Sequence, residues 1–283
     1  MTGYLNYKYD LEDPELAASY DELSCWAARF GTLLLDNIPL GREMSILDLG
    51  CGTGFPLVEI AQACGQSCRV TGMDLWAAGI EKAHSKLRYH NIENAALVRA
   101  DGARLPFGAS QFDLIVSNLG INNFADGHTV MAECYRVAKA GGQIALTTNL
   151  NGHMREFYAA FRETLRALGK TQYLPQLDAN ETHRGSKETT CNLVESAGFK
   201  VMRVIEDSFQ MRYADGSALL NHRLSKLGFL GGWRGVVTPP DEVKVFEAIE
   251  ARLNIEAAKQ GHLRMTVPIL YLQAEKSVDT RIS

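Results

Sequence analysis

Short apolar runs alternate with helical stretches between Ser45 and Asn149, and this pattern constrains the fold more than any other feature of the chain. The runs are Ile46–Leu49, Val70–Met73, Ala96–Val98, Leu114–Val116 and Ile144–Leu146. The stretches with helical period are 56–64, 77–90 and 126–139. Strands that alternate with helices predict an α/β fold, in which helices cover both faces of a parallel sheet.

The regular alternation of strands and helices ends after Asn149. Two more strands are expected at Phe199–Ile205 and Leu263–Ala274, which makes seven in all. Further helices are expected over 21–38, 153–168, 187–197, 217–227 and 241–260. We interpret residues 1–40 as an N-terminal helical cap and 41–283 as the main domain, with an insertion at 208–262. A long insertion in a compact domain is typical of a cover over a substrate site.

A glycine-rich turn joins the first predicted strand to the first helix, in the sequence Ile46 to Pro56. Its glycines, Gly50, Gly52 and Gly54, let the backbone approach a ligand closely. A dinucleotide-binding turn would carry glycine where Phe55 stands, and a P-loop would need a Lys-Ser/Thr pair that is absent. These features predict a nucleoside ligand without phosphates, whose carboxylate would suit the helix N-terminus near Phe55.

Three polar residues follow the next strands. Asp74, at the tip of the second strand, can accept hydrogen bonds from both hydroxyls of a ribose. Asp101 ends the third strand and can accept a hydrogen bond from an exocyclic amine such as adenine N6. Asn118 stands at the carboxyl end of the fourth strand, where ligands bind in open α/β sheets.

Together these stretches resemble the class I S-adenosylmethionine-dependent methyltransferases, in particular the type 11 branch related to ubiquinone/menaquinone C-methyltransferases. The matching segments are Asp48–Gly54, Asp74, Asp101–Gly102, Phe112–Asn118 and Val137–Gly142. They span about residues 45–149, and Ala140 departs from the proline usual before the glycine pair.

The resemblance implies a Rossmann-like sheet of order 3-2-1-4-5-7-6, with strand 7 antiparallel, and S-adenosylmethionine as the cofactor. It also implies that Asp74 binds the ribose, that Asp101 binds the adenine amine and that the glycine turn surrounds the methionyl part. The expected cofactor-binding positions are Tyr20, Asp48, Gly50, Gly52, Gly54, Asp74, Leu75, Asp101, Gly102, Ala103, Asn118 and Leu119.

Each motif also has a plainer interpretation. The glycines could form an ordinary tight turn, and Asp74 or Asp101 could simply cap a helix. The order and spacing of all the elements favour the methyltransferase. Two rival functions remain open: a non-catalytic sensor or scaffold that binds S-adenosylmethionine or its demethylated product, and a nicotinamide dehydrogenase, which Phe55 disfavours.

The acceptor site is less constrained, because an activated sulfonium requires mainly correct geometry from the protein. Candidate substrate-contacting positions are Tyr7, Asn122, Asn123, Met211, Tyr213, Phe229 and Trp233. Candidates for a catalytic role are His222 and Asn122. The alternatives are a polar turn for the asparagines, a packed or surface position for His222, and the core of the insertion for the large apolar residues.

The composition of the chain limits which classes of partner and ligand it is expected to bind. The net charge is −4 and no cluster of Lys and Arg occurs, which disfavours a nucleic acid. The six cysteines are scattered, so we expect reduced thiols, no metal site and a cytoplasmic location. No signal core or membrane-spanning run is present. We expect a small-molecule acceptor with an apolar or mixed character, and a homodimer is left open.

Overall fold

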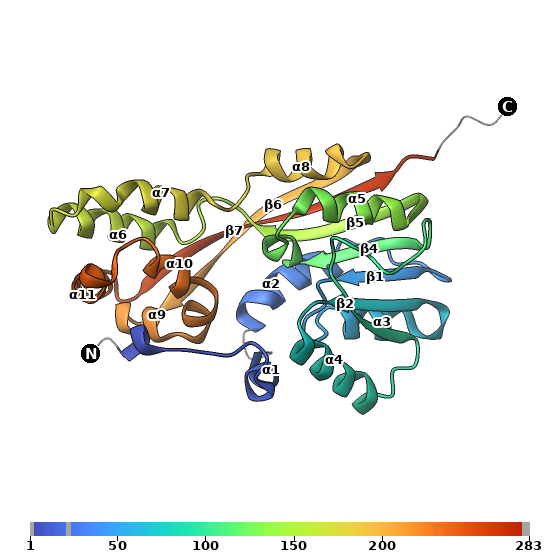
Figure 1. Cartoon of the computed structure of the whole chain (residues 1–283), viewed down its shortest axis with the longest axis horizontal. Helices are drawn as coiled ribbons and strands as arrows, with labels where there is room; N and C mark the ends of the chain where they lie inside the picture. Colours follow the sequence, from blue (N-terminus) through green and yellow to red (C-terminus); the bar gives the residue numbers. More distant parts are fainter. Residues whose placement is uncertain (1–2, 21–23, 279–283) are drawn as a thin grey trace. The chain divides into compact units, whose positions relative to one another are not determined.

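The computed structural model describes residues 3–20 and 24–278 (Figure 1). The chain divides into two compact units, and each is described separately below. We call them the sheet unit and the helical unit. The sheet unit comprises Asp10–Thr148, Lys187–Glu206 and Leu270–Ser283. The helical unit comprises Met1–Tyr9, Asn149–Ser186 and Asp207–Ile269.

The predicted strand order is confirmed: seven strands form one sheet in the order β3-β2-β1-β4-β5-β7-β6. The strands are β1 Ser45–Leu49, β2 Arg69–Asp74, β3 Ala95–Arg99, β4 Phe112–Asn118, β5 Ala138–Asn149, β6 Phe199–Tyr213 and β7 Leu263–Lys276. Parallel ladders join β1 to β2 and β4, β2 to β3, and β4 to β5. The arrow of β7 runs opposite to those of β1 and β4 (Figure 1), so the sheet is mixed as expected.

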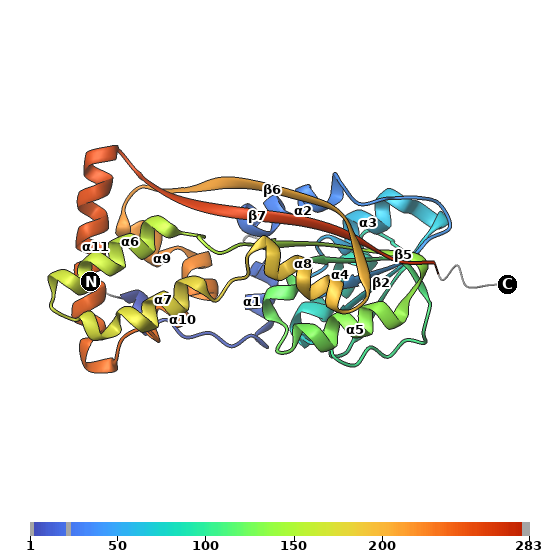
Figure 2. The same cartoon turned by 90° about the horizontal axis from the view of Figure 1, so that it is seen from above.

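Helices cover both faces of the strands in the sheet unit. They are α1 Pro14–Tyr20, α2 Ser24–Leu35, α3 Leu57–Cys64, α4 Ala77–Tyr89, α5 Gly127–Val137 and α8 Lys187–Ser196. Figure 2 shows α2 and α3 on one side of the strands and α5 and α8 on the other. Leu34 of α2 and Ile60 of α3 share a buried cluster with Ile46 of β1. The next residue of β1, Leu47, points to the opposite face and is also fully buried. Both faces of β1 are therefore apolar, which explains why the strands are continuous apolar runs in the sequence.

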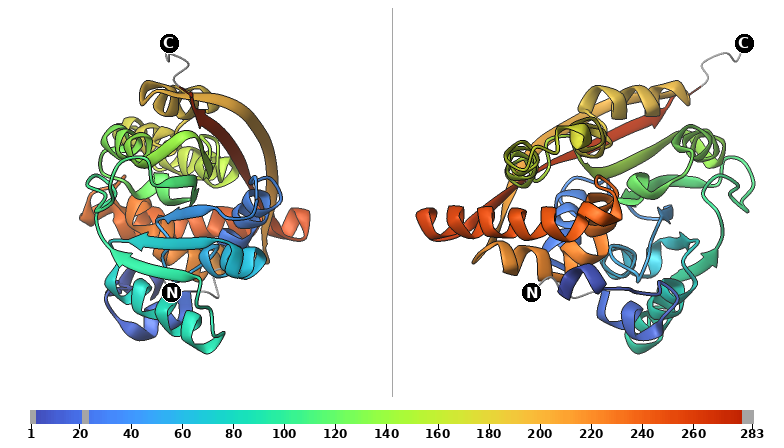
Figure 3. Two further views of the ribbon diagram at one scale, coloured as in Figure 1. Left: turned by 90° about the vertical axis from the view of Figure 1, so that its right-hand side faces the viewer. Right: turned by 60° about the vertical axis from the view of Figure 1, so that its left-hand side comes forward.

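The helical unit is built around aromatic rings. Its helices are α6 Arg155–Ala167, α7 Leu174–Thr182, α9 Gly216–Asn221, α10 Leu230–Arg234 and α11 Pro239–Gln260. The long helix α11, orange-red in Figure 3, contacts α6 and α9. Trp233 stacks on Phe157 with ring centroids 3.9 Å apart, and Phe161 packs edge-on to Phe246 at 5.8 Å.

Short helical turns complete the chain. Those of 3-10 type are Gly3–Asn6, Gly65–Ser67, Gly120–Asn123 and Thr171–Tyr173. A turn of π-helix spans Ser225–Phe229. Among the described helices, none has both the length and the hydropathy needed to cross a bilayer.

The single helix predicted over 217–227 is wrong. Helix α9 ends at Asn221, His222 adopts an extended backbone, and the π turn then leads through Gly228 into α10. The Nδ1 atom of His222 accepts a hydrogen bond from the backbone N–H of Leu224, which stabilises the break. The prediction also ended the sixth strand too early and did not include helix α7.

His153 is the most unusual polar residue in the helical unit. Its side chain is fully buried, and neither ring nitrogen has a hydrogen-bond partner among the described residues. The rings of Tyr158 and Phe229 lie 5.9 and 5.7 Å away, centroid to centroid. Burial, with smaller contributions from the charges of Arg184 and His183, lowers the pKa of His153 from 6.5 to about 3. The folded protein therefore holds this imidazole neutral.

We predict that His153 makes the protein acid-sensitive. Below the ordinary histidine pKa of 6.5, the unfolded chain binds a proton that the folded chain excludes down to about pH 3. Stability therefore falls as the pH decreases through this window, by an amount on the order of 4 kcal/mol at its acid end. His153→Phe keeps an aromatic ring in place and should flatten the dependence, as measured by urea unfolding at a series of pH values.

The matched control is His84→Phe, because His84 is exposed on α4 in the sheet unit. This variant should leave the pH dependence unchanged. An unaltered slope in the His153 variant would contradict the assignment.

Candidate functional site

The glycine turn follows β1 and opens helix α3, as the sequence predicts. Gly50, Gly52 and Gly54 all have positive φ, at 80°, 50° and 99°. A Cβ atom on Gly50 would lie 3.2 Å from the Cα of Gly120, in the turn that follows β4. The two turns therefore meet backbone to backbone, and glycine is required where they touch.

Asp74 links the glycine turn to the end of β2. Its Oδ2 accepts a hydrogen bond of 2.8 Å from the N–H of Gly52, and its Oδ1 accepts one of 2.9 Å from the N–H of Trp76. An ionised carboxylate offers about four acceptor positions, so two remain for the hydroxyls of a ligand. Asp74 is half-buried, which leaves those positions within reach of a bound ribose.

Asp48 lies in the middle of this region and is fully buried in β1. Neither of its carboxylate oxygens makes a hydrogen bond of normal geometry within the described part of the chain. Burial, and after it the nearby charge of Asp74, raises the pKa of Asp48 to about 8. A buried carboxyl group without a partner is costly, and a cationic ligand group would offset that cost.

Asp101 lies beyond the end of β3. It is exposed, and its Oδ1 accepts a hydrogen bond of 2.9 Å from the N–H of Ala103. The turn that this bond closes also contains Gly102, which is buried. The second oxygen of Asp101 stays available for a donor such as an adenine amine.

Asn118 has a different environment from the one we expected of a ligand-contacting residue. Its side chain is buried: Oδ1 accepts a hydrogen bond of 2.8 Å from Thr147 Oγ1, and Nδ2 donates to the carbonyl of Ala27 at 3.3 Å. Asn118 therefore ties β4 to β5 and to α2. The next residue, Leu119, has a positive φ of 66°, which turns the chain sharply away from the strand.

Apolar and aromatic side chains border the end of β2. Leu75 is 60% exposed, and the ring of Tyr20 meets that of Trp76 edge-on at 5.1 Å. Trp76 Nε1 donates to the carbonyl of Leu11, which holds the chain before α1 against this turn. Flat, exposed apolar groups of this kind suit an adenine ring.

The expected cofactor positions thus lie in the sheet unit, and most of them follow the carboxyl ends of β1 to β4. The glycine cradle and the unpartnered Asp48 fit S-adenosylmethionine, whose methionyl part carries an ammonium group beside its carboxylate. The sequence did not single out Trp76 or Thr147, and the signal for Trp76 was its place two residues after Asp74. Thr147 becomes visible only when β5 is paired with β4.

The acceptor candidates are divided between the units. Asn122 accepts a hydrogen bond of 2.7 Å from Thr148 Oγ1, and Asn123 is exposed, both in the sheet unit. The other candidates belong to the helical unit: Tyr7, Met211, Tyr213, His222, Phe229 and Trp233. Met211 and Tyr213 lie in β6, within the interval 208–262 to which we assigned them but before its helices.

Several of these side chains pack within the helical unit itself. Trp233 is 1% exposed and lies 5.6 Å from Phe229, centroid to centroid. The ring of Tyr213 meets that of His222 at 5.3 Å. His222 is exposed at its surface, as expected from the plainer interpretation of a surface histidine.

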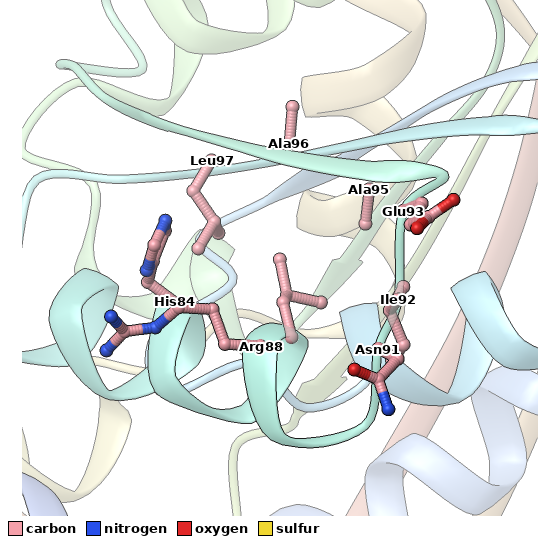
Figure 4. A pocket seen from close by; sticks show the side chains of 9 residues that line it. His84, Arg88, Asn91, Ile92, Glu93, Ala95, Ala96 and Leu97 are labelled. Atoms are coloured by element: carbon pink, nitrogen blue, oxygen red, sulfur yellow. The ribbon is translucent and has the colours of Figure 1, made fainter.

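A hollow of about 540 Å³ lies elsewhere on the sheet unit, between α4 and β3. Figure 4 shows His84 and Arg88 on the helix and Ala95 to Leu97 on the strand. It reaches Asn91, where α4 has ended, and Ala95, where β3 begins. This is the amino end of β3, so the hollow is separate from the site formed by Asp74 and Asp101. Within residues 3–20 and 24–278, no group of three or more His, Cys, Asp or Glu side chains could hold a metal ion.

Comparisons with known proteins agree with this geometry. Residues 46–142 match the sequence family described as "Methyltransferase domain". The chain is 27% identical to the demethylmenaquinone methyltransferase of Listeria welshimeri over 176 residues, which are 59% of this chain and 75% of the relative. It is 34% identical to the enzyme of that name from Anoxybacillus flavithermus over 148 residues, 51% of this chain and 62% of the relative.

A solved structure shares the fold. The YcgJ protein of Bacillus subtilis aligns with a TM-score of 0.58 at 16% identity, covering 88% of this chain and 99% of that one. At this identity the likeness shows the fold alone.

We predict that Asp74→Ala weakens binding of S-adenosylhomocysteine by more than about tenfold, because two hydroxyls lose a charged acceptor and each such bond is worth about 1.5–3 kcal/mol. Asp101→Ala should weaken it less, because only one bond is lost. Calorimetry measures both dissociation constants. Asp74→Asn should have an intermediate effect, since it keeps one acceptor oxygen.

The control for these variants is Asp36→Ala, which removes an exposed carboxylate from the same unit. It should bind as the wild type does. An unchanged dissociation constant in the Asp74 variant would show that the ribose lies elsewhere.

Proposed function

Because residues 46–142 form a class I S-adenosylmethionine-dependent methyltransferase domain, we propose that this methyltransferase acts on a small molecule. The observation that carries the proposal is that the glycine turn, Asp48 and Asp74 come together at the carboxyl ends of β1 and β2. The names of the quinone-methylating relatives support an acceptor with a large apolar body.

The roles of this chain's residues follow from their environments. Asp74 would bind the ribose hydroxyls through its free acceptor positions, and Asp101 would bind the adenine amine. The N–H groups of the glycine turn and the carboxyl of Asp48 would hold the methionyl carboxylate and ammonium. When bound, S-adenosylmethionine supplies a methyl group on a sulfonium that is already activated. The protein's remaining task is to orient the acceptor and exclude water.

We assign no general base. Asn122 is an amide whose oxygen already accepts a hydrogen bond from Thr148. His222 accepts a backbone hydrogen bond through Nδ1 and is exposed. An acceptor that is already ionised or rich in electrons at neutral pH would need no such base. A quinol or another acidic phenol satisfies this condition.

We predict methyl transfer to a soluble, short-chain naphthoquinol under reducing conditions, with release of S-adenosylhomocysteine. The measurement is mass spectrometry of the acceptor, with a catechol, a primary arylamine and an unactivated alcohol as comparison acceptors. Transfer should be fastest to the quinol carbon, because the two hydroxyl groups make that carbon electron-rich. The C–C bond forms as the bond from the methyl group to sulfur breaks, and the proton that the ring carbon then loses passes to water.

Asp74→Ala provides the matched control for catalysis, since it should lose transfer through loss of the cofactor. Tight binding of S-adenosylhomocysteine, with no transfer to any acceptor class, would instead support the sensor or scaffold.

We also propose that residues 208–262 of the helical unit contribute to acceptor recognition as a cover. Residues 1–40, most of which belong to the sheet unit, would act as a helical cap. The support is the concentration of large apolar side chains in the helical unit, which ligand pockets commonly use.

Trp233→Phe tests this role, because it keeps a ring beside Phe157 while changing its size and removing its N–H group. We predict that the KM for the acceptor changes severalfold while the dissociation constant of S-adenosylhomocysteine does not. Met202→Ala, at an exposed side chain of the sheet unit, is the control and should alter neither quantity. Equal loss of cofactor and acceptor binding in the Trp233 variant would indicate a folding defect and contradict the proposal.

A further inference from the structure

A second hollow, of about 340 Å³, lies in the helical unit. Two distant parts of the chain form it, the segment before α1 and the region from the π turn into α10. The lining residues are Tyr7, Lys8, Tyr9, Lys226, Leu230, Gly231 and Arg234. Three of them are cationic and none is acidic.

The positive charge of this hollow is incompletely neutralised. Arg234 Nε forms an ion pair of 2.8 Å with Glu242. Lys8 and Lys226, by contrast, make no ion pair with any residue in the described part of the chain. Lys226 is half-buried, and its charge helps to lower the pKa of His222, after the larger effect of burial. A partly buried ammonium group without a carboxylate partner is costly unless an anion binds to it.

The walls of the hollow are aromatic and apolar. The Nζ of Lys226 lies 4.6 Å from the centroid of the Tyr7 ring, and the rings of Tyr7 and Tyr9 are 6.0 Å apart and inclined at 32°. Tyr9 donates its hydroxyl hydrogen to the carbonyl of Leu227, which fixes its orientation. A Cβ atom added to Gly231 would meet nothing within 4 Å, so the space above this glycine is open.

The backbone that carries Lys226 is itself unusual. Ser225–Phe229 forms a π turn, a conformation that is rare and is found frequently at functional sites. This conformation is a feature of the backbone, independent of the charges and rings, and it occurs in the segment that contributes Lys226.

We propose that this hollow binds a small phosphate monoester that carries an aromatic or apolar body. Two ammonium groups without a carboxylate partner, that of Lys226 over the Tyr7 ring and that of the exposed Lys8, match the two charges of a phosphate monoester near neutral pH better than the single charge of a carboxylate. The rings of Tyr7 and Tyr9, with Leu230, would hold the body of the ligand. The proposal does not rest on cofactor binding, because the hollow belongs to a unit that contains none of the expected cofactor residues.

Phenyl phosphate is the probe, since it joins a dianion to an aromatic ring. Calorimetry on the full chain should show saturable binding that weakens as salt is added. Lys226→Gln should raise the dissociation constant by about tenfold or more, because a charge-assisted contact is lost. Gly231→Phe should also abolish binding, by filling the hollow without changing any charge.

Lys259→Gln is the matched control, because it makes the same change of charge at an exposed position of α11 in the same unit. It should bind phenyl phosphate as the wild type does, and phenol should bind far more weakly than the phosphate. Far-UV circular dichroism establishes that each variant is folded.

Several results would overturn the proposal. They are no saturable binding by the wild type, equal weakening by Lys259→Gln and Lys226→Gln, and equal affinity for phenol and phenyl phosphate. Binding to vesicles of phosphatidic acid without binding to phenyl phosphate would also overturn it, in favour of a surface for anionic lipid.

Discussion

The cofactor site depends on the reversal of strand order between β1 and β4. From β1 the chain builds the sheet outward through β2 and β3, whereas from β4 it continues in the other direction to β5. The helices that follow these strands leave on opposite faces, so the carboxyl ends of β1 and β4 remain uncovered. Gly50 and Gly120 meet at this point with no room for a side chain between them. A larger residue at either position would push the turns apart and displace the atoms that face a ligand.

Most polar residues around this crevice already stabilise the protein. Asp74 accepts hydrogen bonds from two turns, Ser117 donates to the carbonyl of Leu49, and Asn118 joins β4 to β5. A ligand is therefore bound by backbone N–H groups and by the acceptor positions that these side chains leave free. Such a site is preorganised before the ligand binds. Less conformational entropy of the protein is therefore lost on binding.

The sequence predicted the sheet and the glycine turn after β1 well, because strand periodicity and glycine spacing are local signals. It failed over 217–234, where the course of the chain depends on distant contacts. The break at His222 is stabilised by a side chain that accepts a backbone N–H, and α10 is held by Trp233 stacking on Phe157 of α6. For the same reason, Met211 and Trp233 were selected as acceptor contacts on their size and apolarity, which are also the properties of core residues. Asp48 differs from these residues. Its position in the glycine motif identified it in the sequence, but the sequence did not indicate that its side chain is fully buried.

Three polar groups that lack an ion pair or hydrogen bond among the described residues represent two physical situations. Asp48 and His153 are both fully buried without a hydrogen-bond partner, and Lys226 is half-buried, with only the Tyr7 ring beside its ammonium group. Lys226 lines a hollow, so a ligand of opposite charge can reach it, whereas Asp48 is enclosed two residues before the glycine turn begins at Gly50. His153 is enclosed by the rings of Tyr158 and Phe229 and stays neutral. An enclosed neutral group affects stability through pH, whereas an accessible charged group has a cost that only a ligand relieves. The access of a ligand to a polar group, more than the burial of that group, therefore distinguishes residues that can bind a ligand from residues that affect only the stability of the fold.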